Sequence, residues 1–138
     1  MNIVIFGIAD AAQLAHYYFS NDSEHNVVGF TVDSGYIPKS KQFMDLPVVP
    51  FEEVTELYPP KRYAMFVALG YSMLNENRKT KYEVAIEKGY ELVNYISSKA
   101  TVLNKGRFGD NCFVLENNTI QPFVSVGNNV TLWSGNHI

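Results

Sequence analysis

The stretch that decides the fold is the C-terminal run Thr101–Ile138, TVLNKGRFGDNCFVLENNTIQPFVSVGNNVTLWSGNHI. A bulky apolar residue recurs in it at every sixth position: Val102, Phe108, Val114, Ile120, Val126, Leu132 and Ile138. Asparagine and glycine, which accept a positive φ at low cost, fall between them at Asn117-Asn118, Asn128-Asn129 and Gly135-Asn136. A fixed six-residue period is typical of a parallel β-helix, in which short strands alternate with tight corners and neighbouring coils bury each other's apolar faces.

The number of repeats has a consequence for the end of this β-helix. The run from Val102 to His137 holds six hexapeptides, enough for two triangular coils, and Ile138 would open a third. A two-coil stack ends in an unpaired sheet edge, which natural proteins avoid or cover. We therefore expect either that the sequence is a piece of a longer chain or that another chain caps the edge, and we favour the first.

The N-terminal part has a different pattern, in which short apolar runs alternate with amphipathic segments. Strands are expected at residues 3–7, 27–32, 63–69 and 91–96, and helices at residues 11–19, 52–57 and 73–88. Because parallel strands need crossover connections, this alternation predicts a parallel, doubly wound sheet with right-handed crossovers.

The composition excludes several classes of protein. With 138 residues, 46% hydrophobic and 18% charged, the chain has ample material for a packed core. Eleven Lys and Arg against fourteen Asp and Glu give a net charge of −3 with no basic block, so nucleic acid is not an expected partner. A single cysteine, Cys112, fits a reducing compartment. The apolar runs are too short to span a membrane, and no export signal is visible, so we expect a cytoplasmic protein.

The two halves together resemble the sugar O- and N-acyltransferases of the sialic acid O-acetyltransferase type. The segments that carry the resemblance are Ile3–Asp10, Gly29–Asp33, Leu46–Val48, Val67–Gly70 with Arg78 beyond it, the Ser-Ser-Lys-Ala-Thr link at residues 97–101, and the hexapeptides. The resemblance implies an α/β fold class: a small Rossmann-like parallel sheet that binds a nucleotide-linked sugar in residues 1–98, then the first two coils of a left-handed parallel β-helix in residues 99–138.

The resemblance also implies a reaction. Such enzymes are homotrimers that use acetyl-CoA as a co-substrate and acylate an amino or hydroxyl group of a nucleotide-linked sugar, in the synthesis of surface polysaccharides or glycan precursors. Their general base is a histidine on the β-helix. In register with these hexapeptides that histidine would stand two residues past Ile138, so no residue here is assigned as catalytic. We expect the chain to bind the nucleotide-sugar without turning it over.

Candidate nucleotide-sugar-binding residues follow the ends of the expected strands: Gly7, Ile8, Ala9, Asp10, Asp33, Gly70, Tyr71, Asn75 and Arg78. The turn that begins at Gly7 has the spacing G-x-G-x-x-G with only its first glycine, and such a turn directs backbone N–H groups at a diphosphate. Asp10 has a competing interpretation, which we favour, as the N-cap of a capping box with Gln13. Asp33 either accepts hydrogen bonds from a ribose or base, or starts a turn with its side chain.

Arg78 is the most informative charged residue. It falls inside the apolar stripe of the helix expected at 73–88, where a guanidinium needs an anionic partner. A phosphate over the strand ends would serve, as would Asp10, Asp33 or Glu76, and we favour the phosphate. Tyr71 and Asn75 lie at the same predicted sheet edge, where they could stack on or hydrogen-bond a base.

The remaining reactive residues favour structural roles. His16, His25 and His137 are expected at packed or exposed positions, and a single histidine on the β-helix is too few for a metal site. Phe123 and Trp133 form either a trimer or CoA face, or a buried face of the β-helix. Two other functions stay open, namely a dinucleotide-binding domain, which Ala9 in place of a second glycine disfavours, and a non-catalytic oligomerisation module.

Overall fold

Two structural units make up the chain, Met1–Leu92 and Val93–Ile138. The structure is a computed structural model that describes residues 1–69 and 75–138, with residues 75–77 described by their backbone. Each unit has its own sheets and its own buried core, so each is described by itself.

The first unit is built on a five-stranded sheet with the strand order β3-β4-β2-β1-β5. Its strands are β1 (Asn2–Phe6), β2 (Asn26–Val32), β3 (Gln42–Phe43), β4 (Leu46–Pro50) and β5 (Ala64–Val67). β1 pairs in parallel with β2 and β5, and β2 pairs in parallel with β4. The parallel sheet predicted from the alternation of strands and helices is therefore confirmed.

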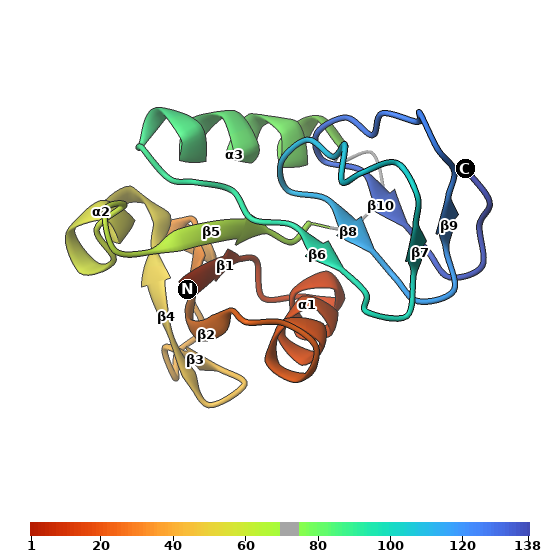
Figure 1. Ribbon diagram of the computed structural model, residues 1–138. Coiled ribbons are helices and arrows are strands. Elements are labelled where there is room, and N and C mark those ends of the chain that lie inside the picture. The colour runs from red at the N-terminus through yellow and green to blue at the C-terminus, as the bar shows by residue number, and fades with distance from the viewer. Residues whose placement is uncertain (70–74) are drawn as a thin grey trace. The chain divides into compact units, whose positions relative to one another are not determined.

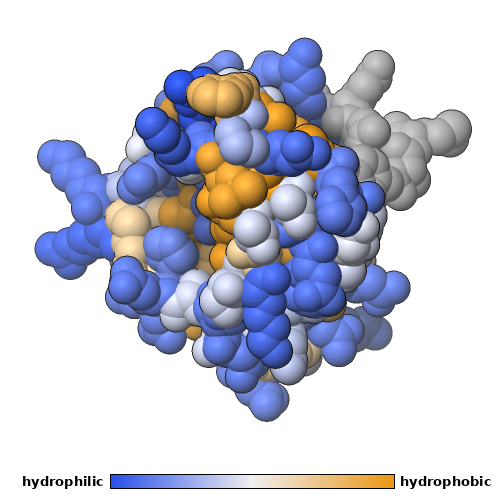
Figure 2. All heavy atoms as spheres, turned by 45° about the vertical axis from the view of Figure 1, so that its right-hand side comes forward, coloured by the Kyte–Doolittle hydropathy of each residue, from blue (hydrophilic) through white to orange (hydrophobic). Residues whose placement is uncertain are grey.

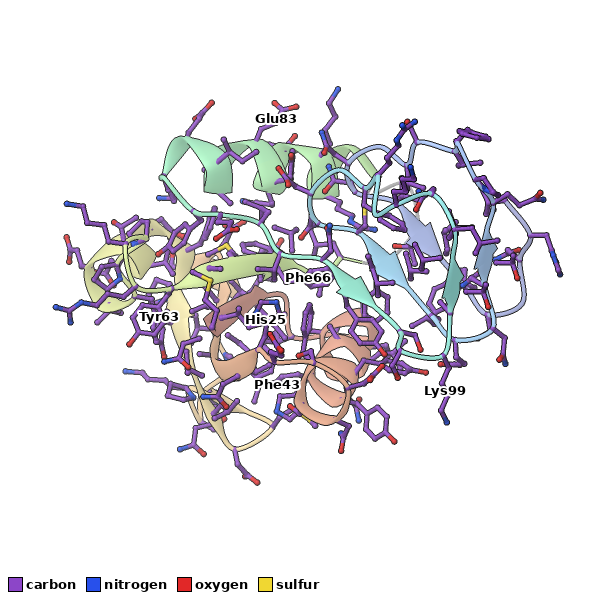
Figure 3. The ribbon with its side chains drawn as sticks, viewed as in Figure 1. His25, Phe43, Tyr63, Phe66, Glu83 and Lys99 are labelled. Carbon is purple, nitrogen blue, oxygen red and sulfur yellow. The ribbon has the colours of Figure 1, made fainter. Side chains whose placement is uncertain are left out.

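Helices cover both faces of this sheet (Figure 1). On one face α1 (Asp10–Asn21) packs its Phe19 ring 5.1 Å from the ring of Phe66 on β5; Phe66 is labelled in Figure 3. On the other face α3 (Asn75–Glu87) contributes Tyr82 to a buried cluster with Val4 and Met65, while Glu83 of α3 points away from the sheet (Figure 3). The short helices η2 (Phe51–Glu53) and α2 (Val54–Leu57) add to the same cluster.

The second unit is a triangular β-helix. Its named strands are β6 (Tyr95–Ile96), β7 (Thr101–Val102), β8 (Phe113–Val114), β9 (Thr119–Ile120) and β10 (Thr131–Leu132). One face pairs β6, β8 and β10, a second pairs β7 with β9, and a bridge between Phe108 and Val126 marks the third. Paired residues such as Tyr95 and Phe113 are 18 apart, so three hexapeptides make one coil, as the period predicts.

The corners of the β-helix repeat with the same six-residue period. Three residues after each apolar position comes a residue with a φ between 58° and 82°: Lys105, Asn111, Asn117, Phe123, Asn129 and Gly135. Asparagine and glycine are expected there because they adopt this left-handed conformation at low cost. Lys105 and Phe123 adopt it without that advantage.

Buried amides link one coil to the next. Asn104, Asn111 and Asn118, one at each corner of the first coil, are at most 1% exposed. The Asn111 side chain donates to the Asn129 side chain at 3.0 Å, and the Asn118 oxygen accepts the backbone N–H of Asn136 at 3.0 Å. Since both partners are 18 residues further along the chain, these bonds fix the register between coils.

One expectation about the strands needs correction, and one pair of strands was not expected. The run 91–96, expected as a last strand of the first sheet, is divided: Leu92 makes an isolated bridge with Met65, whereas Tyr95 and Ile96 pair with the β-helix strand β8. Ile96 is six residues before Val102, so the β-helix begins one face earlier than the sequence predicts. The hairpin of β3 with β4 is also additional.

Candidate functional site

The carboxyl ends of the parallel strands meet at one edge of the first sheet. Gly7 follows β1, Asp33 follows β2, Phe51 follows β4 and Ala68 follows β5. Ligands of open parallel sheets bind in the crevice outside this edge, because the loops and helix N-termini there present unpaired backbone groups. The described residues of this edge therefore form the candidate site.

Gly7 allows the strands to approach closely at the start of the site. Its φ of +120° is unfavourable for any other residue, and a Cβ atom on it would lie 2.6 Å from the carbonyl oxygen of Ala68. Its N–H donates to the Thr31 carbonyl at 2.9 Å. The first glycine of the predicted turn is thus required by the backbone of Ala68, directly after β5, whatever ligand the turn meets.

Asp10 is not the N-cap that the sequence predicts. Helix α1 begins at Asp10 itself, and the N-cap is Ala9, whose carbonyl accepts the N–H groups of Ala12 and Gln13 at 3.0 Å each. Among the described residues no side chain caps this helix. The capping box is wrong because the chain enters the helix one residue early. Asp10 is exposed in the first turn, where a carboxylate stabilises the helix dipole.

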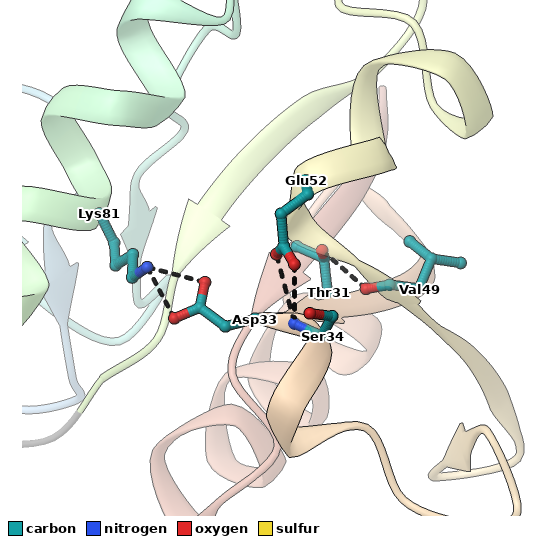
Figure 4. Close-up of polar contacts among 6 residues, drawn as sticks. All are labelled: Thr31, Asp33, Ser34, Val49, Glu52 and Lys81. Carbon is teal, nitrogen blue, oxygen red and sulfur yellow. Dashed lines mark hydrogen bonds and ion pairs between the residues drawn. The ribbon is translucent and has the colours of Figure 1, made fainter.

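Asp33 forms an ion pair with Lys81 of α3. The Lys81 ammonium donates to both carboxylate oxygens, at 2.7 and 2.8 Å (Figure 4). Asp33 also starts the short helix η1 (Ser34–Tyr36), through its backbone carbonyl, which accepts the Tyr36 N–H at 2.9 Å. Within the described residues its side chain makes no capping bond to that helix, so the side-chain turn predicted as one alternative is wrong.

Lys81 is enclosed by aromatic rings. Its ammonium lies 5.5 Å from the ring centroids of Phe6 and of Phe51. These rings contact each other edge to face, with 4.9 Å between centroids. The Lys81 side chain is 19% exposed and that of Asp33 is 39% exposed, so the carboxylate is the more accessible member of the pair.

Glu52 contributes a second carboxylate to this edge. Both of its oxygens accept the backbone N–H of Ser34, at 3.1 and 3.2 Å (Figure 4). Hydrogen bonds from Ser34, from its side chain first and from its backbone next, lower the pKa of Glu52. Nearby, the Thr31 hydroxyl donates to the Val49 carbonyl at 2.9 Å, which joins β2 to β4. The carboxylates of Asp33 and Glu52 and the ammonium of Lys81 therefore lie at this edge.

The other predicted site residues divide into described and undescribed ones. Arg78 is only 5% exposed, in agreement with its expected place in the apolar stripe of α3. Ile8 is half-buried and Ala9 is exposed. Gly70 and Tyr71 lie outside the described residues, as does the side chain of Asn75.

Like Glu52, Lys81 is a site residue that the sequence did not predict, although it had a recognisable signal. It follows Arg78 by three residues and therefore lies on the same side of α3, at the margin of the apolar stripe. This spacing was the available signal. The structure pairs Lys81 with Asp33, one of the acids considered as a partner for Arg78.

Exposed aromatic residues mark the surface of the second unit. Phe123 is 85% exposed and Trp133 is 52% exposed, so the alternative that they form a buried face of the β-helix is wrong. Figure 2 shows a face of the molecule on which hydrophobic side chains gather within a largely hydrophilic surface. Cys112, by contrast, is fully buried in the β-helix core.

Residues 1–69 and 75–138 contain no group of three His, Cys, Asp or Glu side chains placed to hold a metal ion. None of the helices in this part of the chain is long and apolar enough to cross a membrane.

Solved structures resemble the chain over almost its whole length. PerB from Caulobacter crescentus, in complex with CoA and GDP-perosamine, matches 99% of this chain with a TM-score of 0.79 at 20% identity. A histidine-to-asparagine mutant of perosamine N-acetyltransferase from the same organism, with the same ligands, matches 100% with a TM-score of 0.80 at 20% identity. The acetyltransferase domain of PglB from Neisseria gonorrhoeae, in complex with acetyl coenzyme A, matches 99% with a TM-score of 0.76 at 15% identity.

This likeness shows the fold. The chain has the small Rossmann-like unit and the left-handed parallel β-helix of these proteins, in the same order. It spans 63% of the PerB chain, 62% of the mutant chain and 63% of the PglB domain. No family model matches the sequence. The search of curated proteins gave no match either.

Proposed function

We propose that the protein is an acetyl-CoA-dependent acetyltransferase that acts on an amino or hydroxyl group of a nucleotide-linked sugar. The observation that carries the proposal is the order of the two units, a Rossmann-like unit followed by a left-handed β-helix, which PerB shares over 99% of this chain. The structure of PerB contains CoA and GDP-perosamine, and that of the PglB domain contains acetyl coenzyme A. The proposal transfers these two ligand classes to this protein.

The sheet edge suits a nucleotide-linked sugar. The N-terminus of α1 presents backbone N–H groups and the positive end of the helix dipole, both of which attract a phosphate. Arg78 supplies a buried cation on α3. Asp33 supplies a carboxylate that can accept hydrogen bonds from a hydroxyl or an N–H group. These groups support assigning Gly7, Ile8, Ala9, Asp10, Asp33 and Arg78 to the nucleotide-sugar site.

The proposed reaction is nucleophilic attack of the sugar amine or hydroxyl on the thioester carbonyl of acetyl-CoA. The new C–N or C–O bond forms, the C–S bond breaks, and CoA leaves with its sulfur protonated. A general base removes the proton from the nucleophile, and the proposal assigns this role to no residue of this chain. A homotrimer, a cytoplasmic location and a role in surface polysaccharide or glycan precursor synthesis belong to the same proposal.

Calorimetric titration with UDP-, GDP- and dTDP-linked sugars tests the proposal. We expect one of them to bind, and we expect no acetyl transfer by this chain alone. Arg78→Met should weaken that binding, whereas Lys79→Met, which removes an exposed cation from the same turn, should not. Because Arg78 is buried, thermal melting must show that its variant is folded. The absence of binding by all three classes of nucleotide-sugar would contradict the proposal, and binding of NADH would favour a dinucleotide-binding domain.

A further inference from the structure

Lys81 is held more firmly than an ordinary surface lysine. Its ammonium bonds both oxygens of Asp33 and lies over the rings of Phe6 and Phe51. Both rings are nearly buried, with exposures of 5% and 4%. A cation that contacts two aromatic faces and a carboxylate has little freedom to change rotamer. The Lys81 side chain is therefore held in one conformation.

Asp33 is the member of the pair that can meet a ligand. It is twice as exposed as Lys81, with 39% against 19% of the side chain accessible. Each carboxylate oxygen can accept a second hydrogen bond after the one from Lys81. A carboxylate whose two oxygens are both fixed is well suited to accept hydrogen bonds from two neighbouring donors. The 2′- and 3′-hydroxyls of a ribose are such a pair. An acid after the second strand of a nucleotide-binding parallel sheet takes this role in dinucleotide folds.

Glu52, the other carboxylate of the edge, is less suited to this role. Both of its oxygens accept the Ser34 backbone N–H. Its position follows β4, one strand further from β1 than Asp33. Since the helix α1 that would hold the phosphates follows β1, the carboxylate after the adjacent strand β2 is the nearer one in strand order.

We propose that Lys81 is a positioning residue, which holds the Asp33 carboxylate in the orientation that accepts the two ribose hydroxyls of a nucleoside diphosphate. The site would then discriminate ribonucleotides from 2′-deoxyribonucleotides. This inference rests on the proposed function, because it assigns a part of the nucleotide to the same site. Lys81 acts through Asp33 and does not touch the ligand.

Calorimetry on the whole chain with GDP, UDP and their 2′-deoxy counterparts tests this inference. We expect the better-binding ribonucleotide to bind about tenfold more tightly than its deoxy form, the ratio for one hydrogen bond to a charged acceptor. Asp33→Asn should reduce that ratio to about one, so that the ribonucleotide and its deoxy form bind equally well. Lys81→Met should reduce it to about twofold, mainly by weakening the ribonucleotide, and Lys81→Arg should restore most of it.

Lys88→Met is the matched control. The Lys88 ammonium also lies over the Phe51 ring, at 5.0 Å, but it belongs to a lysine beyond the end of α3 and not to the ion pair with Asp33. In Lys88→Met the ratio of the affinities for the ribonucleotide and its deoxy form should equal that of the unchanged protein. A ratio is used because general damage to the fold weakens both forms of the nucleotide alike, so an equal loss of both in Lys81→Met would count against the inference.

The outcomes separate this inference from the proposed function. If GDP or UDP binds as tightly as its deoxy form, the inference is overturned and the nucleotide site stands. If Lys81→Met keeps the full ratio, Lys81 has no positioning role. If none of the four nucleotides binds to the unchanged protein, the inference fails, and the proposed function fails with it only if the UDP-, GDP- and dTDP-linked sugars do not bind either.

Discussion

Substituting alanine at Gly109 and at Gly127 tests how the coils of the β-helix stack. The two glycines are 18 residues apart and occupy equivalent positions on successive coils. A Cβ atom on Gly109 would lie 2.7 Å from the carbonyl carbon of Gly127 and 2.8 Å from the nitrogen of Asn128, and would collide with the Asn128 side-chain oxygen. For a Cβ atom on Gly127, no described atom lies within 4 Å.

The expected effects have opposite signs. Overpacking of this kind costs about 1–3 kcal/mol. Displacing the Asn128 side chain also breaks its 2.8 Å hydrogen bond from the Asp110 N–H, which adds about 0.5–1.5 kcal/mol. Replacing glycine by alanine lowers the conformational entropy of the unfolded chain, which stabilises the folded state by about 0.4–1 kcal/mol. Gly109→Ala should therefore destabilise by about 2–3 kcal/mol, whereas Gly127→Ala should stabilise by up to about 1 kcal/mol.

Urea unfolding followed by tryptophan fluorescence measures both variants. The chain has one tryptophan, Trp133, which follows β10 and therefore reports on the β-helix. The unfolding midpoint of Gly109→Ala should fall and that of Gly127→Ala should stay or rise, with unchanged slopes. Equal midpoints for the two variants would refute the stacking of Gly109 against the next coil.

Three further predictions concern single side chains. Phe123→Asn should stabilise by about 1 kcal/mol, because Phe123 is 85% exposed and asparagine adopts its φ of 71° more readily; urea unfolding measures it. Asn118→Ala should destabilise by about 1–3 kcal/mol, because it removes a buried amide that donates to the carbonyls of Leu115 and Leu132 and accepts the Asn136 N–H. Burial raises the pKa of Tyr90 to about 12, so the stability that its neutral phenol provides is present below pH 10 and is lost as pH rises towards 12. Tyr90→Phe should flatten that decline in a pH series of unfolding curves.

Each of these predictions has a control. Asn117→Gly removes the side chain of a neighbouring corner asparagine that is exposed, at a φ of 63° that glycine adopts at low cost, and it should cost less than Asn118→Ala. Phe123→Leu keeps an apolar side chain with the same backbone strain and should bring no gain. For Tyr90, the free energy of unfolding of Tyr90→Phe could fall as steeply at alkaline pH as that of the unchanged protein. That result would assign the loss of stability to other groups. Tyr58 is one of them, because burial raises its pKa as well.

The β-helix was predictable because its signal is periodic. A side chain at every sixth residue enters the core, and sequence shows such a period without knowledge of the pairing. Its first strand was not predictable in the same way. Tyr95 and Ile96 follow an apolar run that would suit either sheet, and the choice is made by pairing with Phe113 and Val114, which no local pattern reveals.

The hairpin of β3 with β4 escaped prediction for a local reason. Its two-residue turn consists of Met44 and Asp45, with φ values of 52° and 61°. Turns of this type usually carry asparagine and glycine, and methionine gives no such signal. The tertiary pairing of β3 imposes a backbone conformation that the residue type alone would not favour.

The candidate site was predictable in position but not in its contacts. The strand ends place Gly7 and Asp33 at one edge whatever their side chains do, because the strands are parallel. A helical wheel puts Arg78 and Lys81 on the same side of α3, but it cannot tell which cation reaches Asp33. That choice depends on the axial position of the helix over the sheet, which the packing of Tyr82 and its neighbours determines.

Two nested periods restrict how the β-helix can change in length. Removing six residues would leave an apolar side chain at each inward position, but it would place Gly135 where Asn129 now meets Asn111. Removing 18 residues would preserve both the apolar spacing and the ladder of amides. Insertions and deletions in this unit should therefore be tolerated in steps of 18 residues, which is one whole coil, and not in steps of six, which is one face.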